Sequence, residues 1–135
     1  MSGLPGLLLA GLAMTAAAAG AGAPIRLAGA VPGVERLATP LTEAAICRTL
    51  ADALADAAGS RVMLADAAGP DDAGRWARID LDIRSATTLS ARLRHGRGAQ
   101  AQDLPEAGFS VADRPLGQRQ IELFAQSLAH QITAR

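Results

Sequence analysis

The clearest pattern in the chain is a strict alternation of apolar and charged residues within residues 76–84. The apolar members are Ala77, Ile79, Leu81 and Ile83, and the charged members are Arg78, Asp80, Asp82 and Arg84. Because successive side chains of a strand point to opposite faces, this period of two predicts a strand with one dry face and one wet face. Residues 86–94 repeat the pattern, with Leu89, Ala91 and Leu93 in the apolar positions.

Two such strands in succession predict an antiparallel hairpin, and the pattern constrains its register. Ile83 and Leu89 must point to the same face, so the connection must hold an odd number of residues. A loop of three residues places Asp80 opposite Arg92, and a loop of five places Asp82 opposite Arg92. Either register sets an acid beside a base on the wet face, where such a pair contributes about 0.2–1 kcal/mol.

Two further segments repeat their apolar residues at the period of a helix. The first begins at Thr39 or Thr42, either of which suits an N-cap, and ends at Gly59, which suits a C-terminal cap. The second opens at residues 115–117. The apolar stripes are Ile46, Leu50, Ala53, Leu54 and Ala57 in the first helix, and Ile121, Phe124, Ala125, Leu128 and Ile132 in the second. Short strands are expected at residues 61–65 and 109–112, and loops at residues 66–75 and 95–107.

The order of these elements predicts an α+β fold of two layers, in which a small, mostly antiparallel sheet of three to four strands packs against two helices. Residues 22–39 are rich in Pro, Gly and Ala and are interpreted as an extended lead, with one short strand near residues 25–28. The small α/β domain then spans residues 40–135. The element order loosely resembles that of small envelope domains such as the amino-terminal domain of the Tol translocation protein, as an analogy of architecture alone.

The start of the chain is typical of a secretion signal. Residues 4–23 carry no charged side chain, and a leucine-rich core is followed by small residues at the spacing that signal peptidases recognise. Residues 1–21 are therefore interpreted as a signal peptide, with cleavage near residues 19–23. The first three residues lack Arg and Lys, and the uncharged run approaches the roughly 20 residues that cross a bilayer, so an uncleaved membrane anchor is the alternative. We expect a periplasmic or extracellular protein, or one anchored in the membrane and facing the periplasm.

Composition narrows the class of partner. The 13 basic residues balance the 13 acidic ones, so no overall field attracts nucleic acid or an anionic membrane. Aromatic residues make up only 2% of the chain, which leaves few side chains to stack on bases. A nucleic-acid partner is therefore not expected, and a membrane partner only if the N-terminal segment is retained.

No set of residues has the spacing of a catalytic or metal centre. The single cysteine, Cys47, pairs in principle with His95 or His130, but it borders an apolar stripe and favours a buried thiol. Asp80 and Asp82 are explained by pairing with arginines across the hairpin. Neither His-x-x-x-His nor Cys-x-x-Cys occurs. We therefore expect a protein without enzymatic activity, cofactor or metal.

One cluster of residues suits ligand or partner binding. It consists of Arg78, Arg92, Arg94, His95 and Arg97, which gather at one end of the predicted hairpin. Guanidinium groups match the geometry of carboxylates and phosphates. The competing interpretation is a solvated face whose charges pair internally.

These observations favour a small exported, non-catalytic binding or accessory protein of the cell envelope. Its partner would be an envelope protein or an anionic envelope component, contacted through the arginine end of the hairpin, an exposed strand edge or the groove between the helices. The alternatives are a small secreted hydrolase that uses Cys47 or the pair Asp80 and Asp82, and a membrane-anchored subunit with an uncleaved N-terminal helix.

Overall fold

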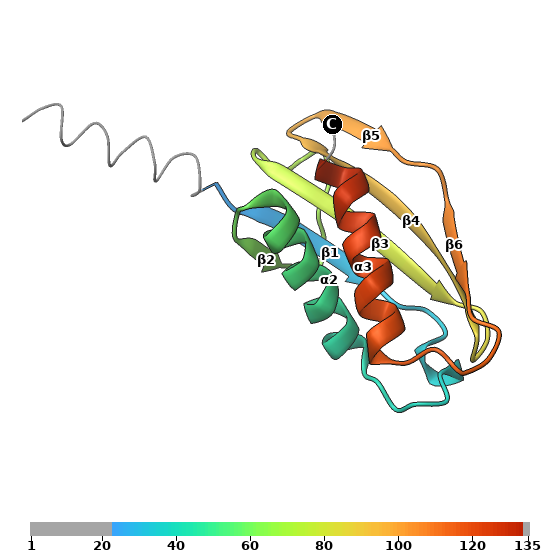
Figure 1. Cartoon of the computed structure of the whole chain (residues 1–135). Helices are drawn as coiled ribbons and strands as arrows, with labels where there is room; N and C mark the ends of the chain where they lie inside the picture. Colours follow the sequence, from blue (N-terminus) through green and yellow to red (C-terminus); the bar gives the residue numbers. More distant parts are fainter. Residues whose placement is uncertain (1–22, 134–135) are drawn as a thin grey trace, which may run out of the picture.

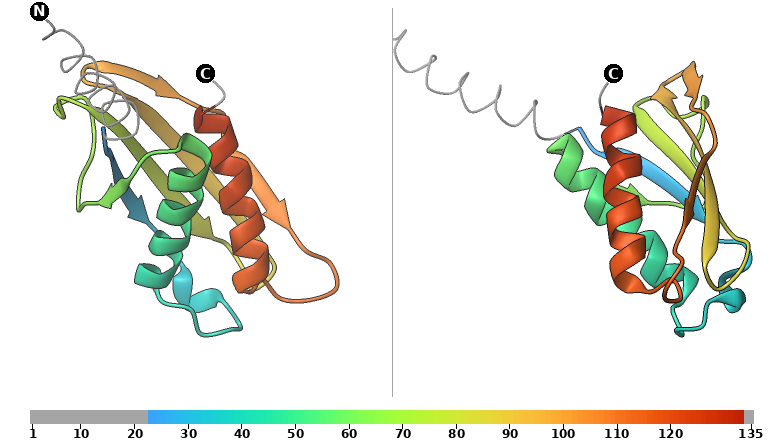
Figure 2. Two further views of the ribbon diagram at one scale, coloured as in Figure 1. Left: turned by 60° about the vertical axis from the view of Figure 1, so that its left-hand side comes forward. Right: turned by 45° about the vertical axis from the view of Figure 1, so that its right-hand side comes forward.

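The computed structural model describes residues 23–133, and the predicted signal peptide, residues 1–21, lies outside them. The elements in chain order are β1 (Ile25–Ala30), the short 3-10 helix η1 (Val34–Arg36), α2 (Glu43–Ala58), β2 (Val62–Leu64), β3 (Arg75–Ile83), β4 (Thr88–Arg97), β5 (Gln100–Asp103), β6 (Ala107–Ser110) and α3 (Gln118–Thr133). Helices α2 and α3 lie side by side across one face of the sheet (Figure 1). The right-hand view of Figure 2 shows both helices on the same side of the strands. The α+β fold with two helices on a sheet is thus confirmed.

The sheet is larger and more mixed than predicted. It has six strands in the order β2-β1-β3-β4-β5, with β6 also paired to β4, instead of three to four mostly antiparallel strands. β1 pairs in parallel with both β2 and β3, whereas the pairs of β4 are antiparallel. The pair β1–β2 is parallel because α2 carries the chain from the end of β1 back to the start of β2, which is a βαβ crossover. Residues 65–74 return the chain once more, so β3 also runs parallel to β1.

The short strand expected near residues 25–28 is present, but the structure corrects the interpretation of residues 22–39 as an extended lead. Residues 25–30 form β1, which lies between β2 and β3 in the interior of the sheet. Ile25 and Leu27 are buried in the main core beneath the helices. Gly29 follows on the same face, where a Cβ atom would lie 2.9 Å from Sγ of Cys47. The missing side chain therefore lets α2 approach β1 closely, and it also interrupts the apolar alternation that reveals a strand.

The predicted hairpin is present with the register of the three-residue loop. Asp80 lies opposite Arg92, and Ile83 lies opposite Leu89. β4 continues to Arg97, beyond the predicted end at residue 94, and part of the expected loop at residues 95–107 forms β5. A two-residue turn joins β4 to β5, with Gly98 at a φ of 56°. A left-handed residue at the first position of such a turn favours glycine.

The helix caps and the core follow the predicted pattern. Of the two candidate N-caps, Thr42 is the one used, and its side chain accepts a hydrogen bond from the backbone nitrogen of Ala45 at 3.1 Å. Gly59 ends α2 in the left-handed conformation. Both apolar stripes and the dry face of the hairpin meet in a single core. Within residues 23–133, no helix combines the length and the hydrophobicity needed to cross a membrane.

Candidate functional site

The pleat of the sheet divides the five predicted binding residues into two groups. His95 lies opposite Ala77, a core residue beneath the helices, so His95 and Arg97 belong to the helix-facing side of the sheet. Arg78, Arg92 and Arg94 belong to the other side. The prediction of one continuous cluster is therefore wrong, because neighbouring residues of β4 point to opposite faces. We call the sheet surface that carries Arg78, Asp80, Asp82, Arg92 and Arg94 the open face.

Several charges of the open face are already paired. Nε of Arg94 lies 3.1 Å from a carboxylate oxygen of Asp103 on β5. Arg84 contacts Asp82 at 3.6 Å and Glu106 at 3.3 Å. All of these side chains are well exposed, so each pair contributes at most about 1 kcal/mol to folding. Their main effect is to neutralise the margin of the open face.

The centre of the open face is different. Asp80 and Arg92 lie directly opposite each other, yet within residues 23–133 the two side chains form no ion pair. Arg78, which lies opposite Arg94, is likewise without an ion pair in this part of the chain. A hollow of about 360 Å³ opens beside these side chains; it is lined by Arg78, Asp80, Arg92, Leu93, Arg94, Asp103, Leu104 and Glu106. Two exposed guanidinium groups are thus available to a partner.

A loop of residues 65–74 borders the open face on the other side. Ala68 of this loop packs on Trp76 and Ala28 in a small second core. Arg26 donates a hydrogen bond from Nε to the carbonyl oxygen of Ala67 at 3.1 Å and lies 3.5 Å from Asp72. These contacts anchor the loop, which borders a second hollow of about 160 Å³ next to Arg78 and Asp80.

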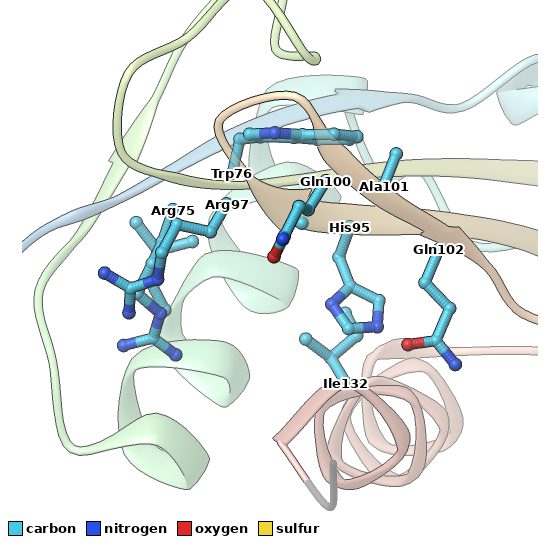
Figure 3. A pocket seen from close by; sticks show the side chains of 10 residues that line it. Arg75, Trp76, His95, Arg97, Gln100, Ala101, Gln102 and Ile132 are labelled. Atoms are coloured by element: carbon cyan, nitrogen blue, oxygen red, sulfur yellow. The ribbon is translucent and has the colours of Figure 1, made fainter.

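The remaining predicted residues, His95 and Arg97, line a pocket at the other face of the sheet. It has a volume of about 450 Å³ and is lined by Ile25, Arg75, Trp76, His95, Gly96, Arg97, Gln100, Ala101, Gln102 and Ile132; we call it the end pocket. Figure 3 shows Arg75 and Arg97 next to each other, and His95 pointing towards Ile132 of α3.

Arg75 was assigned to a loop at the sequence level and was therefore missed. β3 begins at Arg75, which lies on the same side of the strand as Ala77 and on the face opposite Arg78. The alternation of apolar and charged residues does not reach this end of the strand, because Arg75 is charged on the apolar side and Trp76 is apolar on the charged side. The sequence pattern therefore carried no signal for Arg75.

Two other surfaces correspond to the predicted alternatives. The groove between the helices has a volume of about 420 Å³ and is acidic; it is lined by Thr49, Asp52, Ala53, Asp56, Gln118, Glu122 and Gln126. Nε2 of Gln118 on α3 donates a hydrogen bond across the groove to Oγ1 of Thr49 on α2 at 3.1 Å, and it also donates to Glu122 of its own helix at 3.1 Å. The sheet has strand edges at β2 on one side and at β5 and β6 on the other, and at the β2 edge Met63 and Leu64 are 50% and 48% exposed.

Cys47 is half-buried between α2 and β1, against Gly29. Burial raises the pKa of its thiol, and the neighbouring carboxylate of Glu43 raises it further. The reactive form of a cysteine is the thiolate, so a raised pKa lowers its nucleophilicity at neutral pH. These surroundings are the reverse of those that activate a catalytic cysteine.

Comparisons with known proteins add a likeness of fold. No model of a protein family matches the chain, and no curated protein matches it. Among solved structures, the chain is similar to an uncharacterized protein at 13% identity and a TM-score of 0.50, over 84% of this chain and 89% of that one. It is also similar to lipoprotein GNA1162 from Neisseria meningitidis at 17% identity and a TM-score of 0.48, over 82% of this chain and 96% of that one. The first likeness shows a shared fold.

Proposed function

We propose that the protein is exported to the cell envelope and acts there as a non-catalytic binding or accessory protein. Its open face contacts an acidic surface of an envelope protein or an anionic envelope component. The observation that carries this proposal is that the guanidinium groups of Arg78 and Arg92 are exposed and form no ion pair within residues 23–133. Support for export comes from the uncharged, leucine-rich start of the sequence.

The distribution of charge over the open face, with its positive centre, favours an acidic partner. At the margin Arg94 engages Asp103, and Arg84 contacts both Asp82 and Glu106, so over the whole face four arginines balance four carboxylates. The charges left over at the centre are the two arginines Arg78 and Arg92 against the single carboxylate of Asp80. A guanidinium group binds a carboxylate or phosphate through two parallel hydrogen bonds, which gives direction as well as attraction.

The support beneath these arginines favours recognition by a preformed surface. Arg78 and Arg92 project from β3 and β4, whose opposite faces carry the fully buried residues Ile79 and Leu93. Side chains that stand on packed strands are held more accurately than those on loops. A partner therefore meets the two guanidinium groups at a spacing that the strand register sets.

The binding part of the proposal is tested by sedimentation with the envelope fraction of cells that lack the protein. Wild type is expected to sediment with this fraction at low ionic strength and to be released as salt screens the contact. The double variant Arg78→Gln/Arg92→Gln is expected to remain in the supernatant. Arg114→Gln/Arg119→Gln removes the same charge from exposed positions outside the open face and is the matched control. Equal sedimentation of both double variants would contradict the proposal.

The export part is tested separately by the mass of the protein purified from its host. Cleavage near residues 19–23 is expected to yield a shortened chain that osmotic shock releases. An intact chain, starting at Met1 and recovered from the cytosol, would overturn export.

A further inference from the structure

The end pocket brings two positive charges together. Arg75 and Arg97 lie directly opposite each other in the pairing of β3 with β4, and both line the pocket. Directly opposed residues of an antiparallel pair have Cβ atoms about 4.5–5.5 Å apart. Figure 3 shows the two guanidinium groups adjacent to one another at one side of the cavity.

Within residues 23–133 no ion pair engages either arginine, and the residues that line the end pocket include neither Asp nor Glu. Asp72 lines a neighbouring hollow of about 260 Å³ together with both of them, but it lies 3.5 Å from Arg26. Ile132, in the last turn of α3, lies at the opposite wall, but a helix C-terminus supplies only about half a negative charge. Like charges directly opposite each other on a sheet are destabilising. An anion between the two arginines removes this repulsion.

The local backbone holds the two arginines in place. Arg97 is the last residue before the two-residue turn of Gly98 and Ala99. Nε1 of Trp76 donates a hydrogen bond to the carbonyl oxygen of Gly98 at 2.9 Å, and the nitrogen of Gly98 donates to the carbonyl oxygen of Gly74 at 3.0 Å. The turn that follows Arg97 is thus tied to the segment that precedes Arg75.

We infer that the end pocket binds a phosphate group through Arg75 and Arg97. A phosphate monoester has three terminal oxygens and a charge between about −1.5 and −2 at neutral pH, so it can accept hydrogen bonds from two guanidinium groups at once. A carboxylate has only two oxygens, and one guanidinium group can donate a hydrogen bond to each of them. The imidazole of His95 and the amides of Gln100 and Gln102 line the space beside the arginines, and Ile25 and Ile132 supply apolar walls.

This inference goes beyond the proposed function and is independent of it. The pocket lies on the helix-facing side of the sheet, whereas Arg78 and Arg92 lie on the open face. The volume of about 450 Å³ exceeds that of the phosphate group alone. The phosphate can therefore come from a soluble phosphate ester or from a lipid headgroup.

Isothermal titration calorimetry of the purified protein, in a phosphate-free buffer of low ionic strength, tests the site. The probes are inorganic phosphate, glycerol 3-phosphate and acetate. Wild type is expected to bind both phosphate probes and to bind acetate more weakly. Arg75→Gln/Arg97→Gln is expected to lose about tenfold or more in phosphate affinity. Arg114→Gln/Arg119→Gln is expected to change it less than twofold.

A vesicle arm distinguishes the two sources of phosphate. Phosphatidylcholine vesicles with and without phosphatidic acid are sedimented with wild type and with the Arg75→Gln/Arg97→Gln variant. Binding that requires phosphatidic acid and both arginines assigns the site to a lipid headgroup. Binding of glycerol 3-phosphate without binding to these vesicles assigns it to a soluble ester. Either result supports the phosphate site.

Thermal unfolding separates the loss of a site from the loss of the fold. The ligand-free Arg75→Gln/Arg97→Gln variant is expected to have a Tm equal to or above that of wild type, because the repulsion is gone. Phosphate is expected to raise the Tm of wild type but not of this variant. Arg75→Lys/Arg97→Lys keeps the positive charges but loses the guanidinium groups that donate two parallel hydrogen bonds, so this variant should bind phosphate more weakly than wild type. Absence of saturable phosphate binding by wild type, or undiminished binding by Arg75→Gln/Arg97→Gln, would overturn the inference.

Discussion

Nε1 of Trp76, on β3, donates a hydrogen bond of 2.9 Å to the carbonyl oxygen of Gly98, in the turn between β4 and β5. The indole is only 1% exposed and packs on Ala28 and Ala68, away from the main core. This single tryptophan therefore joins three parts of the chain: the loop of residues 65–74, the first residues of β3 and the turn that follows Arg97.

Trp76→Phe should destabilise the fold by about 1–3 kcal/mol. Phenylalanine keeps most of the apolar contact with Ala28 and Ala68 but leaves the carbonyl oxygen of Gly98 without its donor. Urea unfolding followed by circular dichroism measures the change. A midpoint identical to that of wild type would show that the hydrogen bond contributes nothing.

Gly29→Ala should destabilise the fold by about 1–3 kcal/mol, because the new methyl group would lie 2.9 Å from Sγ of Cys47. In the background of Cys47→Ala the same substitution should cost much less, since Sγ is gone. The double-mutant cycle from four urea titrations gives the coupling energy. Additive effects would contradict the close packing of α2 on β1.

The thiol of Cys47 should react slowly in the folded protein. Burial and Glu43 raise its pKa, so the folded state prefers the protonated thiol. The stability that this preference contributes is present below the ordinary thiol pKa of 9.0 and is lost as the pH rises through the higher folded value. Labelling with a chromogenic disulfide should therefore be faster in urea than in native buffer at pH 7.

The Cys47→Ala variant provides the matched control for this pH dependence. Its free energy of unfolding should lack the part of the decline above pH 9.0 that belongs to the thiol. Equal labelling rates for folded and unfolded wild type at pH 7 would show that Cys47 is accessible and ionised normally.

Leu81→Ala should cost about 2–5 kcal/mol, since Leu81 is fully buried beneath the helices. Arg94→Gln, on the open face, breaks only the exposed ion pair with Asp103 and should cost less than about 1 kcal/mol. Both values come from urea unfolding under the same conditions. A larger loss for Arg94→Gln than for Leu81→Ala would reverse the assignment of the two faces.

The hairpin and the helices were predictable because their signals are local. Ile79, Leu81 and Ile83 alternate with charged residues. Because the apolar side chains of both strands must share the buried, helix-facing side of the sheet, only two registers were considered for the hairpin. The sequence did not distinguish a loop of three residues from one of five, because both registers place an acidic residue opposite an arginine. Thr39 and Thr42 were likewise equally suitable as N-caps, because the sequence did not show that α2 begins at Glu43.

Two strands are only weakly marked in the sequence: β1, expected only as a short strand near residues 25–28, and β5, expected as part of a loop. β1 has Gly29 where its pattern calls for an apolar residue, because the space above it belongs to Cys47 of a distant helix. β5 has no large apolar residue and is exposed along its whole length, and it is a strand only because β4 offers it hydrogen bonds. Its existence therefore depends on a partner that local periodicity does not reveal.

The candidate site was predicted in part for the same reason. Arg78 and Arg92 follow from the alternation of the hairpin, and both lie on the open face as expected of the wet side. His95 and Arg97 were grouped with them because β4 was ended at residue 94. Extending the strand by three residues moves them to the opposite face and reveals their neighbour Arg75.

Photo-crosslinking in the native host tests most directly whether the open face is the contact surface. A benzophenone side chain is placed at Ala67 beside Arg78, at Gln126 in the helix groove, or at Met63 on the β2 edge. The account predicts a crosslinked envelope component from position 67, which disappears in the Arg78→Gln/Arg92→Gln background. Crosslinks from position 126 or 63 alone would contradict it.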